Sequence, residues 1–298
     1  SLPTYPFERK RYWKKPGALK RKTPLESTAY PAGKKPEIAD WFYVPQWNRS
    51  TLSPAGQGEE LRTTRAGTWN CLFFTNRGHL AGQLEERLRR EGATVVTVGE
   101  GEGYRRIGEQ EYRVNPRSFD DYRELFRDFE ETHGQPDKIV HMWNVTGKPA
   151  AGETQGSGWE EGSQYQGYYS LIYLARAIGI ERIGNPLQIE VISDHLQDVT
   201  GEEELEPWKA SLLGVVKVLP QEYPNIRSRS IDIREPGPGT REEKELIGHL
   251  LREMEQPPAV PVVAYRGNYR WVQVYEAVRW PGTAAGMPKL QRRGVYMI

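Results

Sequence analysis

Two residues of the chain have the types and the spacing that reduction of a carbonyl group requires. Ser193 follows a run of apolar residues, and Lys209 stands sixteen residues later. In such chemistry a serine holds the carbonyl oxygen, a tyrosine donates a proton, and a lysine four residues after the tyrosine lowers the pKa of its phenol. The position four residues before Lys209 holds Leu205, which cannot donate a proton. We therefore interpret Ser193 and Lys209 as scaffold residues and predict no catalytic residue in this chain.

The turn where a dinucleotide would bind is also altered. The loop after the first buried strand reads Thr75-Asn76-Arg77-Gly78-His79-Leu80-Ala81-Gly82. Dinucleotide-binding reductases have Thr-Gly-x-x-x-Gly-x-Gly here, because glycines let the backbone approach the pyrophosphate at a helix N-terminus. Asn76 and Leu80 replace the first two glycines and only Gly82 remains, so we expect the two side chains to crowd the pyrophosphate. Arg77 could still hold a phosphate, but the degenerate loop predicts no cofactor-binding residue in this chain.

Other glycine-rich and acidic segments are candidates for weaker reasons. The cluster Gly99-Glu100-Gly101-Glu102-Gly103 follows the second strand and carries two acids that would repel phosphate, so we expect a mobile turn. Glu100 lies roughly where a ribose-binding acid would stand, but that role needs the missing loop. Asp194-His195 followed by Glu202-Glu203-Glu204 could carry acid–base or cation chemistry, and we expect instead a solvated acidic loop that opens a helix.

Neither the histidines nor the cysteine predicts a metal site. No pair of histidines has the spacing of metal ligands, and each is expected to be a turn, surface or satisfied core residue. Cys71 has no partner for a disulfide or a thiolate site and is expected in the core, which indicates a reducing, cytoplasmic setting. The histidines are His79, His133, His141, His195 and His249.

Length and charge narrow the class of protein. The 298 residues, 37% hydrophobic and 27% charged, suit one large soluble domain or two modest ones. A net charge of +1 conceals +8 over residues 1–36 and −7 over the remainder. Such a basic arm can bind nucleic acid or serve as a solvated linker, and its six prolines favour an extended linker. We expect no nucleic-acid partner, and the chain shows no apolar run for a membrane helix and no secretory signal.

The hydrophobic pattern alternates between strands and helices from about residue 40 onward. This alternation predicts βαβ units, a parallel sheet and a doubly wound α/β fold. Pro45 should confine the first strand to an edge or a strand end. The expected strands are 41–47, 69–74, 93–98, 138–143, 187–192, 227–233, 260–265 and 270–275, and the expected helices are 80–88, 119–129, 168–178, 208–218 and 242–254.

At the N-terminus, the segment Leu2-Pro3-Thr4-Tyr5-Pro6-Phe7-Glu8-Arg9-Lys10-Arg11-Tyr12-Trp13 resembles the tail that closes the ketosynthase–acyltransferase block of modular polyketide synthases. In that family the tail packs back over the acyltransferase and its linker onto the ketosynthase. The resemblance implies that residues 1–13 are this tail and that residues 14–39 are a basic, proline-rich linker. The aromatic anchors of the interdomain packing would be Tyr5, Phe7, Tyr12 and Trp13.

The remainder of the chain, residues 40–298, resembles the structural, non-catalytic subdomain of a ketoreductase from such synthases. The similar stretches lie at 139–146, 167–171, 199–203, 217–226, 229–232 and 263–273. The resemblance implies a truncated Rossmann-like fold of the short-chain dehydrogenase/reductase type, which braces a catalytic subdomain and binds no cofactor itself. NADPH is expected in the catalytic half. The implied partners are that catalytic subdomain, the ketosynthase–acyltransferase block and, indirectly, an acyl carrier protein.

The last nine residues, Leu290-Gln291-Arg292-Arg293-Gly294-Val295-Tyr296-Met297-Ile298, resemble the lead-in to the catalytic half. Residues 294–298 would then be the first strand of that half, and its glycine-rich loop would follow. The expected function is a scaffold within a multienzyme rather than an enzyme. Two alternatives remain open at this point: an active reductase with a non-standard cofactor loop, and a docking or dimerisation module built on an inactive reductase fold.

Overall fold

The computed structural model describes residues 35–52, 69–147 and 159–279. Contacts divide the chain into two units, one formed by Phe42–Val278 and the other by the residues on either side of it. In the second unit a short 3-10 helix, η1 (Ile38–Asp40), lies beside Arg279, whose guanidinium pairs with Glu37 at 2.5 Å. The predictions that lie outside the described residues concern the tail at 1–13, most of the linker at 14–39, the strand at 294–298, and the anchors Tyr5, Phe7, Tyr12 and Trp13.

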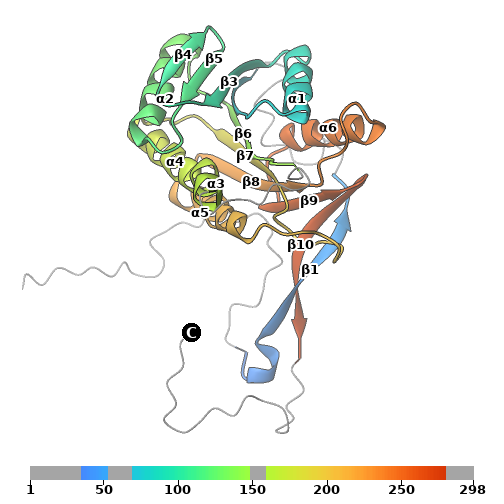
Figure 1. Cartoon of the computed structure of the whole chain (residues 1–298). Coiled ribbons are helices and arrows are strands. Elements are labelled where there is room, and N and C mark those ends of the chain that lie inside the picture. The colour runs from blue at the N-terminus through green and yellow to red at the C-terminus, as the bar shows by residue number, and fades with distance from the viewer. Residues whose placement is uncertain (1–34, 53–68, 148–158, 280–298) are drawn as a thin grey trace, which may run out of the picture. The chain divides into compact units, whose positions relative to one another are not determined.

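The described part of the larger unit is organised around one mixed sheet (Figure 1). Its strands are β1 (Phe42–Ser50), β2 (Asn70–Phe74), β3 (Thr94–Glu100), β4 (Arg105–Gly108), β5 (Glu111–Val114), β6 (Lys138–Asn144), β7 (Leu187–Asp194), β8 (Ile226–Ile233), β9 (Val262–Arg266) and β10 (Tyr269–Val278). They are ordered β1-β10-β9-β8-β7-β6-β2-β3-β5-β4. The strands from β9 to β5 are parallel to one another, whereas β10, β1 and β4 are antiparallel additions.

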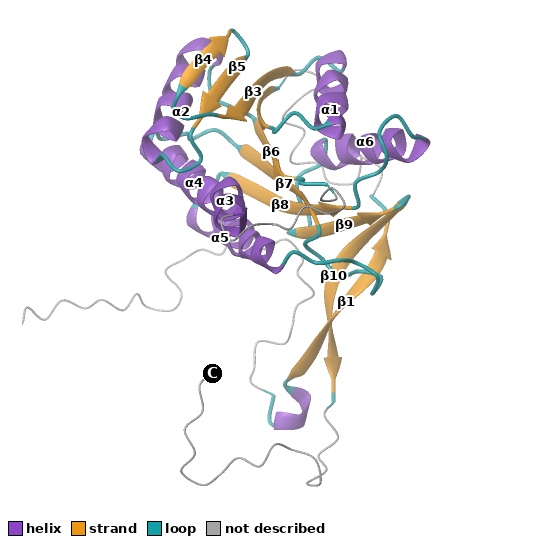
Figure 2. Cartoon of the chain, viewed as in Figure 1, coloured by secondary structure: helices purple, strands orange, loops and turns teal. Residues whose placement is uncertain are grey.

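Helices cover both faces of this sheet, as Figure 2 shows. Their bounds are α1 (His79–Arg90), α2 (Phe119–His133), α3 (Trp159–Gln164), the π-helix η2 (Tyr165–Tyr169), α4 (Ser170–Ile180), the 3-10 helix η3 (Pro207–Ser211), α5 (Leu212–Glu222) and α6 (Arg241–Met254). Helices α1 and α6 pack on one face, and α2, α4 and α5 pack on the other. The predicted doubly wound α/β fold is confirmed, since apolar strands are buried between two helical layers.

Local sequence signals explain where the helices begin and end. Thr240 caps α6, because its Oγ1 accepts a hydrogen bond from the backbone N–H of Glu243 at 3.2 Å. Gly92 follows α1 and Gly134 ends α2, and both adopt positive φ values, 95° and 78°, that L side chains disfavour. The leucine stripe predicted for α1 is buried in the core, as the spacing of Leu80, Leu84 and Leu88 requires.

The structure departs from the predicted elements in two places. The hairpin of β4 and β5 was not predicted, because the residues of β4 are all exposed and carry no apolar period. The helical segment predicted at 168–178 begins earlier, at residue 159, and passes through the π-helix before α4. The edge position expected from Pro45 is confirmed, since β1 is the last strand in the order and pairs with β10.

A buried network of ion pairs connects the sheet to α6. Arg229 of β8 donates to both carboxylate oxygens of Glu190, at 2.7 and 2.9 Å, and to the carboxylate of Glu253 in α6. The hydroxyl of Tyr265 donates to Glu253 at 2.8 Å, and Arg270 of β10 pairs with the same carboxylate. The network therefore ties strands β7, β8, β9 and β10 to the end of α6. In the part of the chain that is described, no helix is long and apolar enough to cross a membrane.

Candidate functional site

The loop after β2 stands where a doubly wound sheet places a dinucleotide, at the carboxyl end of its strands. In this chain the loop is held by hydrogen bonds within itself and to the loop after β6. The Oγ1 of Thr75 accepts a hydrogen bond from the N–H of Arg77 at 2.9 Å, and Arg77 has a φ of 63°, in the left-handed region. Asn76 reaches across the loop, and its Nδ2 donates to the carbonyl of Val145 at 3.3 Å. The exposed Asn76 and Arg77 thus occupy the approach to the N-terminus of α1.

The cation that could have held a phosphate is engaged elsewhere. The guanidinium of Arg77 forms an ion pair with Glu111 on β5. Leu80 lies within the core at 2% exposure, so its side chain is turned away from the loop. This corrects the expectation that Leu80 crowds a pyrophosphate. Asn76 and Arg77 are the side chains at the mouth of the loop, and no atom lies within 4 Å of a Cβ built at Gly82.

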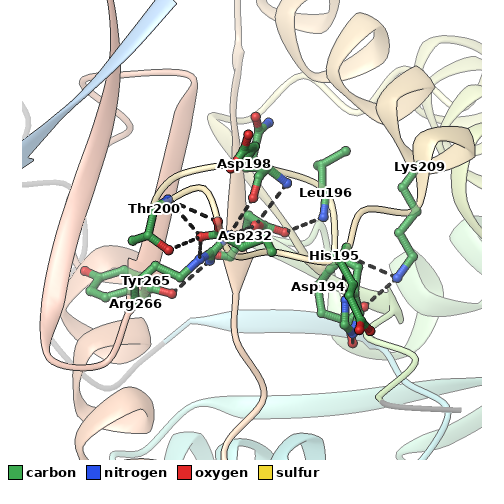
Figure 3. A network of polar contacts seen from close by, with 12 residues as sticks. Asp194, His195, Leu196, Asp198, Thr200, Lys209, Asp232, Tyr265 and Arg266 are labelled. Atoms are coloured by element: carbon green, nitrogen blue, oxygen red, sulfur yellow. Dashed lines mark hydrogen bonds and ion pairs between the residues drawn. The ribbon is translucent and has the colours of Figure 1, made fainter.

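Lys209 is locked in a buried ion pair (Figure 3). Its Nζ lies 2.5 Å from Asp194 Oδ1 and 2.9 Å from a carboxylate oxygen of Glu206. The same ammonium donates to the carbonyl of Asn144 and to the hydroxyl of Thr146, both at 3.0 Å. With its side chain only 1% exposed, Lys209 has its charge and its donors satisfied by the protein.

The other two positions of the reductase pattern are Leu205 and Ser193, and neither forms a reactive group together with the ammonium of Lys209. Leu205, four residues before Lys209, is 44% exposed in the loop that follows β7. Ser193 is fully buried at the end of β7, and its hydroxyl has no hydrogen-bond partner among the described residues. Neither position places a proton-donating side chain against the ammonium of Lys209.

A second buried carboxylate lies at the end of the neighbouring strand. Asp232 of β8 accepts hydrogen bonds from the N–H groups of Leu196 and Gln197 at 3.1 and 3.2 Å. The guanidinium of Arg266 bridges Asp232, at 2.6 Å, and Glu203, at 2.7 Å. These contacts gather the loop after β7 around Arg266, as Figure 3 shows.

The prediction of a solvated acidic loop is therefore wrong for two of its members. Asp194 is 1% exposed, and the side chain of Glu203 is 12% exposed. Burial of Glu203 opposes its ionisation, but hydrogen bonds from Arg266 and Thr200 outweigh burial and lower the pKa of this carboxyl to about 2. Glu202 and Glu204 are exposed as expected. The sequence could not reveal the difference, because Arg266 lies far along the chain.

The two aspartates act in the same way. Asp194, at the end of β7, accepts the N–H of Thr146 at 3.1 Å and of Gly147 at 2.8 Å in the loop that leaves β6. Asp232, at the end of β8, holds the loop that leaves β7. Each carboxylate thus anchors the loop of the preceding strand in the chain, and each is paired with a buried cation, Lys209 or Arg266. The carboxyl edge of the sheet, where related folds bind ligands, is fastened by its own side chains.

The glycine cluster at 99–103 overlaps the end of β3 and differs from the expected mobile turn. Gly99 and Glu100 belong to strand β3, and the N–H of Gly101 donates to the carbonyl of Val114 at 2.9 Å. Arg113 lies directly over Gly99, where a Cβ would be 2.8 Å from its Nη1. The carboxylate of Glu100 accepts a hydrogen bond from Gln166 at 2.5 Å, so it is used within the protein.

The histidines have separate roles in packing and hydrogen bonding. His79 contacts Glu243 at 2.7 Å, His133 contacts the carbonyl of Glu109 at 3.1 Å, and His195 contacts that of Glu204 at 2.9 Å. His249 stacks on Tyr265, and His141 is buried in the core. Among residues 35–52, 69–147 and 159–279, no three acidic, histidine or cysteine side chains are grouped to hold a metal ion.

Cys71 lies in the core, as expected from the sequence, and burial raises the pKa of its thiol to about 12. A thiol that stays protonated at neutral pH is a poor nucleophile and a poor metal ligand. Cys71 therefore serves as a small apolar residue of β2.

The π-helix η2 approaches β6 closely at one glycine. A Cβ at Gly167 would lie 2.6 Å from Oδ1 and 3.1 Å from Nδ2 of Asn144. We expect Gly167→Ala to lower the free energy of unfolding by about 1–3 kcal/mol, because Asn144 is buried and must shift. Gly214→Ala in α5 is the matched control, since no atom lies within 4 Å of its Cβ position. It should be neutral or stabilising, as alanine favours helices. Equal effects in urea denaturation would contradict this prediction.

The sequence of the chain matches a known protein family. Residues 70–253 match the family described as beta-ketoacyl synthase-like, N-terminal. A stretch of 148 residues, half of the chain, is 25% identical to polyketide synthase PksM of Bacillus subtilis (strain 168), of which the chain spans 3%. The chain thus corresponds to a small part of that protein's length.

Solved structures of ketoreductases share the fold. Each of the following matches covers 80% of this chain. A multidomain structure of a keto acid-selecting nonribosomal peptide synthetase module has a TM-score of 0.67 at 20% identity over 18% of its length. An N-terminal ketoreductase from the macrolactin assembly line has a TM-score of 0.61 at 14% identity over 45%. The first ketoreductase of the tylosin polyketide synthase has a TM-score of 0.53 at 16% identity over 42%.

The chain therefore belongs to the beta-ketoacyl synthase-like, N-terminal family. It shares its fold with these ketoreductase-containing structures. The truncated Rossmann-like class expected from the sequence is confirmed at this level.

Proposed function

We propose that the chain is the non-catalytic scaffold part of a ketoreductase in a modular polyketide synthase. In the whole synthase it braces a catalytic subdomain, which reduces a β-ketoacyl chain carried by an acyl carrier protein with NADPH. Its other direct partner is the ketosynthase–acyltransferase block, contacted by the aromatic residues of the N-terminal tail. The assembly is a cytoplasmic multienzyme in this proposal, and the chain alone is not an enzyme.

The observation that carries the proposal is the complete engagement of Lys209. A catalytic lysine lowers the pKa of a tyrosine only when its ammonium stands beside the phenol. Here the ammonium is buried against Asp194 and satisfied by three further groups. Freeing Lys209 for chemistry would leave the carboxylate of Asp194 buried without its counter-charge, which is costly. The pair is therefore better suited to stability than to turnover.

The loop after β2 supports the same proposal for the cofactor. A phosphate at the N-terminus of α1 would need Arg77 to leave Glu111 and Asn76 to leave Val145. Both contacts tie this loop to other parts of the sheet. The residues present do not fit a pyrophosphate, and we assign NADPH to the catalytic subdomain instead.

Calorimetric titration with NADPH tests the proposal in two arms. The chain alone should show no saturable heat of binding. The loop after β2 is engaged through Asn76 and Arg77, and Lys209 is engaged with Asp194, in contacts within the chain. A short-chain reductase subdomain that carries the glycine-rich loop should bind NADPH under the same conditions and serves as the positive control. Addition of the chain to the catalytic subdomain of its own synthase should raise the rate at which that subdomain reduces a β-ketoacyl substrate.

Micromolar binding of NADPH to the chain alone would overturn the non-catalytic assignment and favour the active-reductase alternative. Failure of the chain to raise the rate of the catalytic subdomain would overturn the bracing role. The two arms therefore test the two halves of the proposal separately.

A further inference from the structure

A strip of buried polar side chains crosses three adjacent strands near their carboxyl ends. In the register of the sheet, Ser193 of β7 is paired with Asn144 of β6 on one side and with Asp232 of β8 on the other. All three residues are at most 2% exposed. The centre of a parallel sheet is usually apolar, because both of its faces are covered. The polar atoms of this strip therefore need hydrogen-bond partners.

The three residues differ in whether their polar atoms are satisfied. Asp232 is fully engaged with the loop after β7 and with Arg266. The Nδ2 of Asn144 and the Oγ of Ser193 have no hydrogen-bond partner among the described residues, and neither has Nε1 of the adjacent Trp143. Buried polar atoms in native proteins are almost always hydrogen-bonded, to protein or to ordered water. Asn144 and Ser193 are paired in the sheet, so the absence of a partner for either side chain indicates that they share one hydrogen-bonding group.

The surroundings restrict what that partner is. The π-helix η2 lies close against Asn144, because a Cβ built at Gly167 would be 2.6 Å from its Oδ1. The nearby ion pairs hold more acids than cations, since Lys209 faces both Asp194 and Glu206. Arg266 likewise faces both Asp232 and Glu203, so an anion here would be repelled. A cation cannot accept the hydrogen bonds that Asn144 Nδ2 and Trp143 Nε1 have to donate. Water is small and uncharged, and it both donates and accepts hydrogen bonds.

We propose that Ser193 and Asn144 together hold an internal water molecule at the carboxyl ends of β6 and β7, beneath the π-helix η2. The Nδ2 of Asn144 donates to the water oxygen, and the hydroxyl of Ser193 either donates to it or accepts from it. In carbonyl reduction a serine at this position donates to a substrate oxygen. Here the same hydroxyl instead forms a hydrogen bond with the internal water molecule. The site goes beyond the scaffold function and does not depend on it.

A crystal structure of the whole chain, at a resolution that shows ordered solvent, tests the proposal directly. We expect an electron-density peak within hydrogen-bonding distance of both Ser193 Oγ and Asn144 Nδ2. Absence of the peak, with the serine hydroxyl turned to a main-chain carbonyl, would overturn the proposal.

Thermal unfolding of Ser193→Ala gives a second readout in solution. If the hydroxyl is satisfied by water, its loss should lower Tm by about 2–4 °C. If the hydroxyl is unpaired, the variant should keep or raise the Tm of the wild type, and the proposal fails. Ser228→Ala is the matched reference, because its hydroxyl donates to the carbonyl of Val216 at 2.6 Å and is also buried. A fall in Tm close to that of Ser228→Ala supports the water site, since the Ser228 hydroxyl is known to be satisfied.

Discussion

Replacing Arg229 with methionine is expected to lower the free energy of unfolding by about 3–5 kcal/mol. The side chain of Arg229 is 1% exposed and lies between Glu190 and Glu253, which are both fully buried. Methionine fills similar space but removes the charge, so Glu190 is left without a cation beside it. Arg270 still compensates Glu253. Urea denaturation at neutral pH measures the loss.

Two variants separate the charge effect from the effect of substitution itself. Arg227→Met, two residues earlier on β8, changes an exposed arginine and should alter the free energy of unfolding by no more than about 0.5 kcal/mol. Adding Glu190→Gln to Arg229→Met should recover part of the loss, because the uncompensated charge is then removed as well. A loss below about 1 kcal/mol for Arg229→Met would show that the network does not stabilise the sheet as we expect.

Acid should destabilise the protein through His141. Burial lowers the pKa of this imidazole from its ordinary value of 6.5 to about 3, and no carboxylate balances its charge. The unfolded chain therefore binds a proton between these two values that the folded chain does not, so stability is full above pH 6.5 and falls as the pH drops toward 3. Each pH unit within this window costs about 1.4 kcal/mol, which amounts to about 3 kcal/mol between pH 7 and pH 4.

The contribution of His141 is isolated by comparing slopes rather than absolute stabilities. His141→Gln should lose about 3 kcal/mol less than the wild type between pH 7 and pH 4, whatever its stability at neutral pH. Glutamine can still accept the hydrogen bond from Ser170, which contacts His141 Nε2 at 2.9 Å. Identical slopes for the wild type and His141→Gln would contradict the prediction.

The fold could be predicted from the sequence because its signals are local. The apolar run of β2, the leucine period of α1 and the glycine that ends it are all visible within a few residues. The same is true of the degenerate loop at Asn76 and of Leu205 before Lys209. The hairpin of β4 and β5 escaped prediction because its exposed strand carries no alternation of apolar and polar residues.

The contacts that decide the site are not local, and the sequence could not reveal them. The sequence predicts that Glu203 is a solvated acid, but Arg266, sixty-three residues later, pairs with it. Leu80 occupies a glycine position of the cofactor pattern, but the same residue belongs to the helical stripe that faces the core. The leucine spacing correctly predicted that Leu80 lies in the core. The cofactor motif predicted instead that Leu80 would crowd a pyrophosphate, and the structure contradicts this. The assignment of the tail and of the final strand stays a prediction.

The two anchoring aspartates also have a consequence for how this chain can be divided or extended. Insertion and chain cleavage are tolerated where the backbone is exposed and makes few hydrogen bonds. The loops after β6 and β7 leave the carboxyl edge of the sheet, and their N–H groups are held by Asp194 and Asp232. A new terminus or a grafted segment at residues 145–147 or 195–197 would cut these anchors. Split or permuted forms of the protein should therefore be opened away from the carboxyl edge, for instance at the exposed turn between β9 and β10.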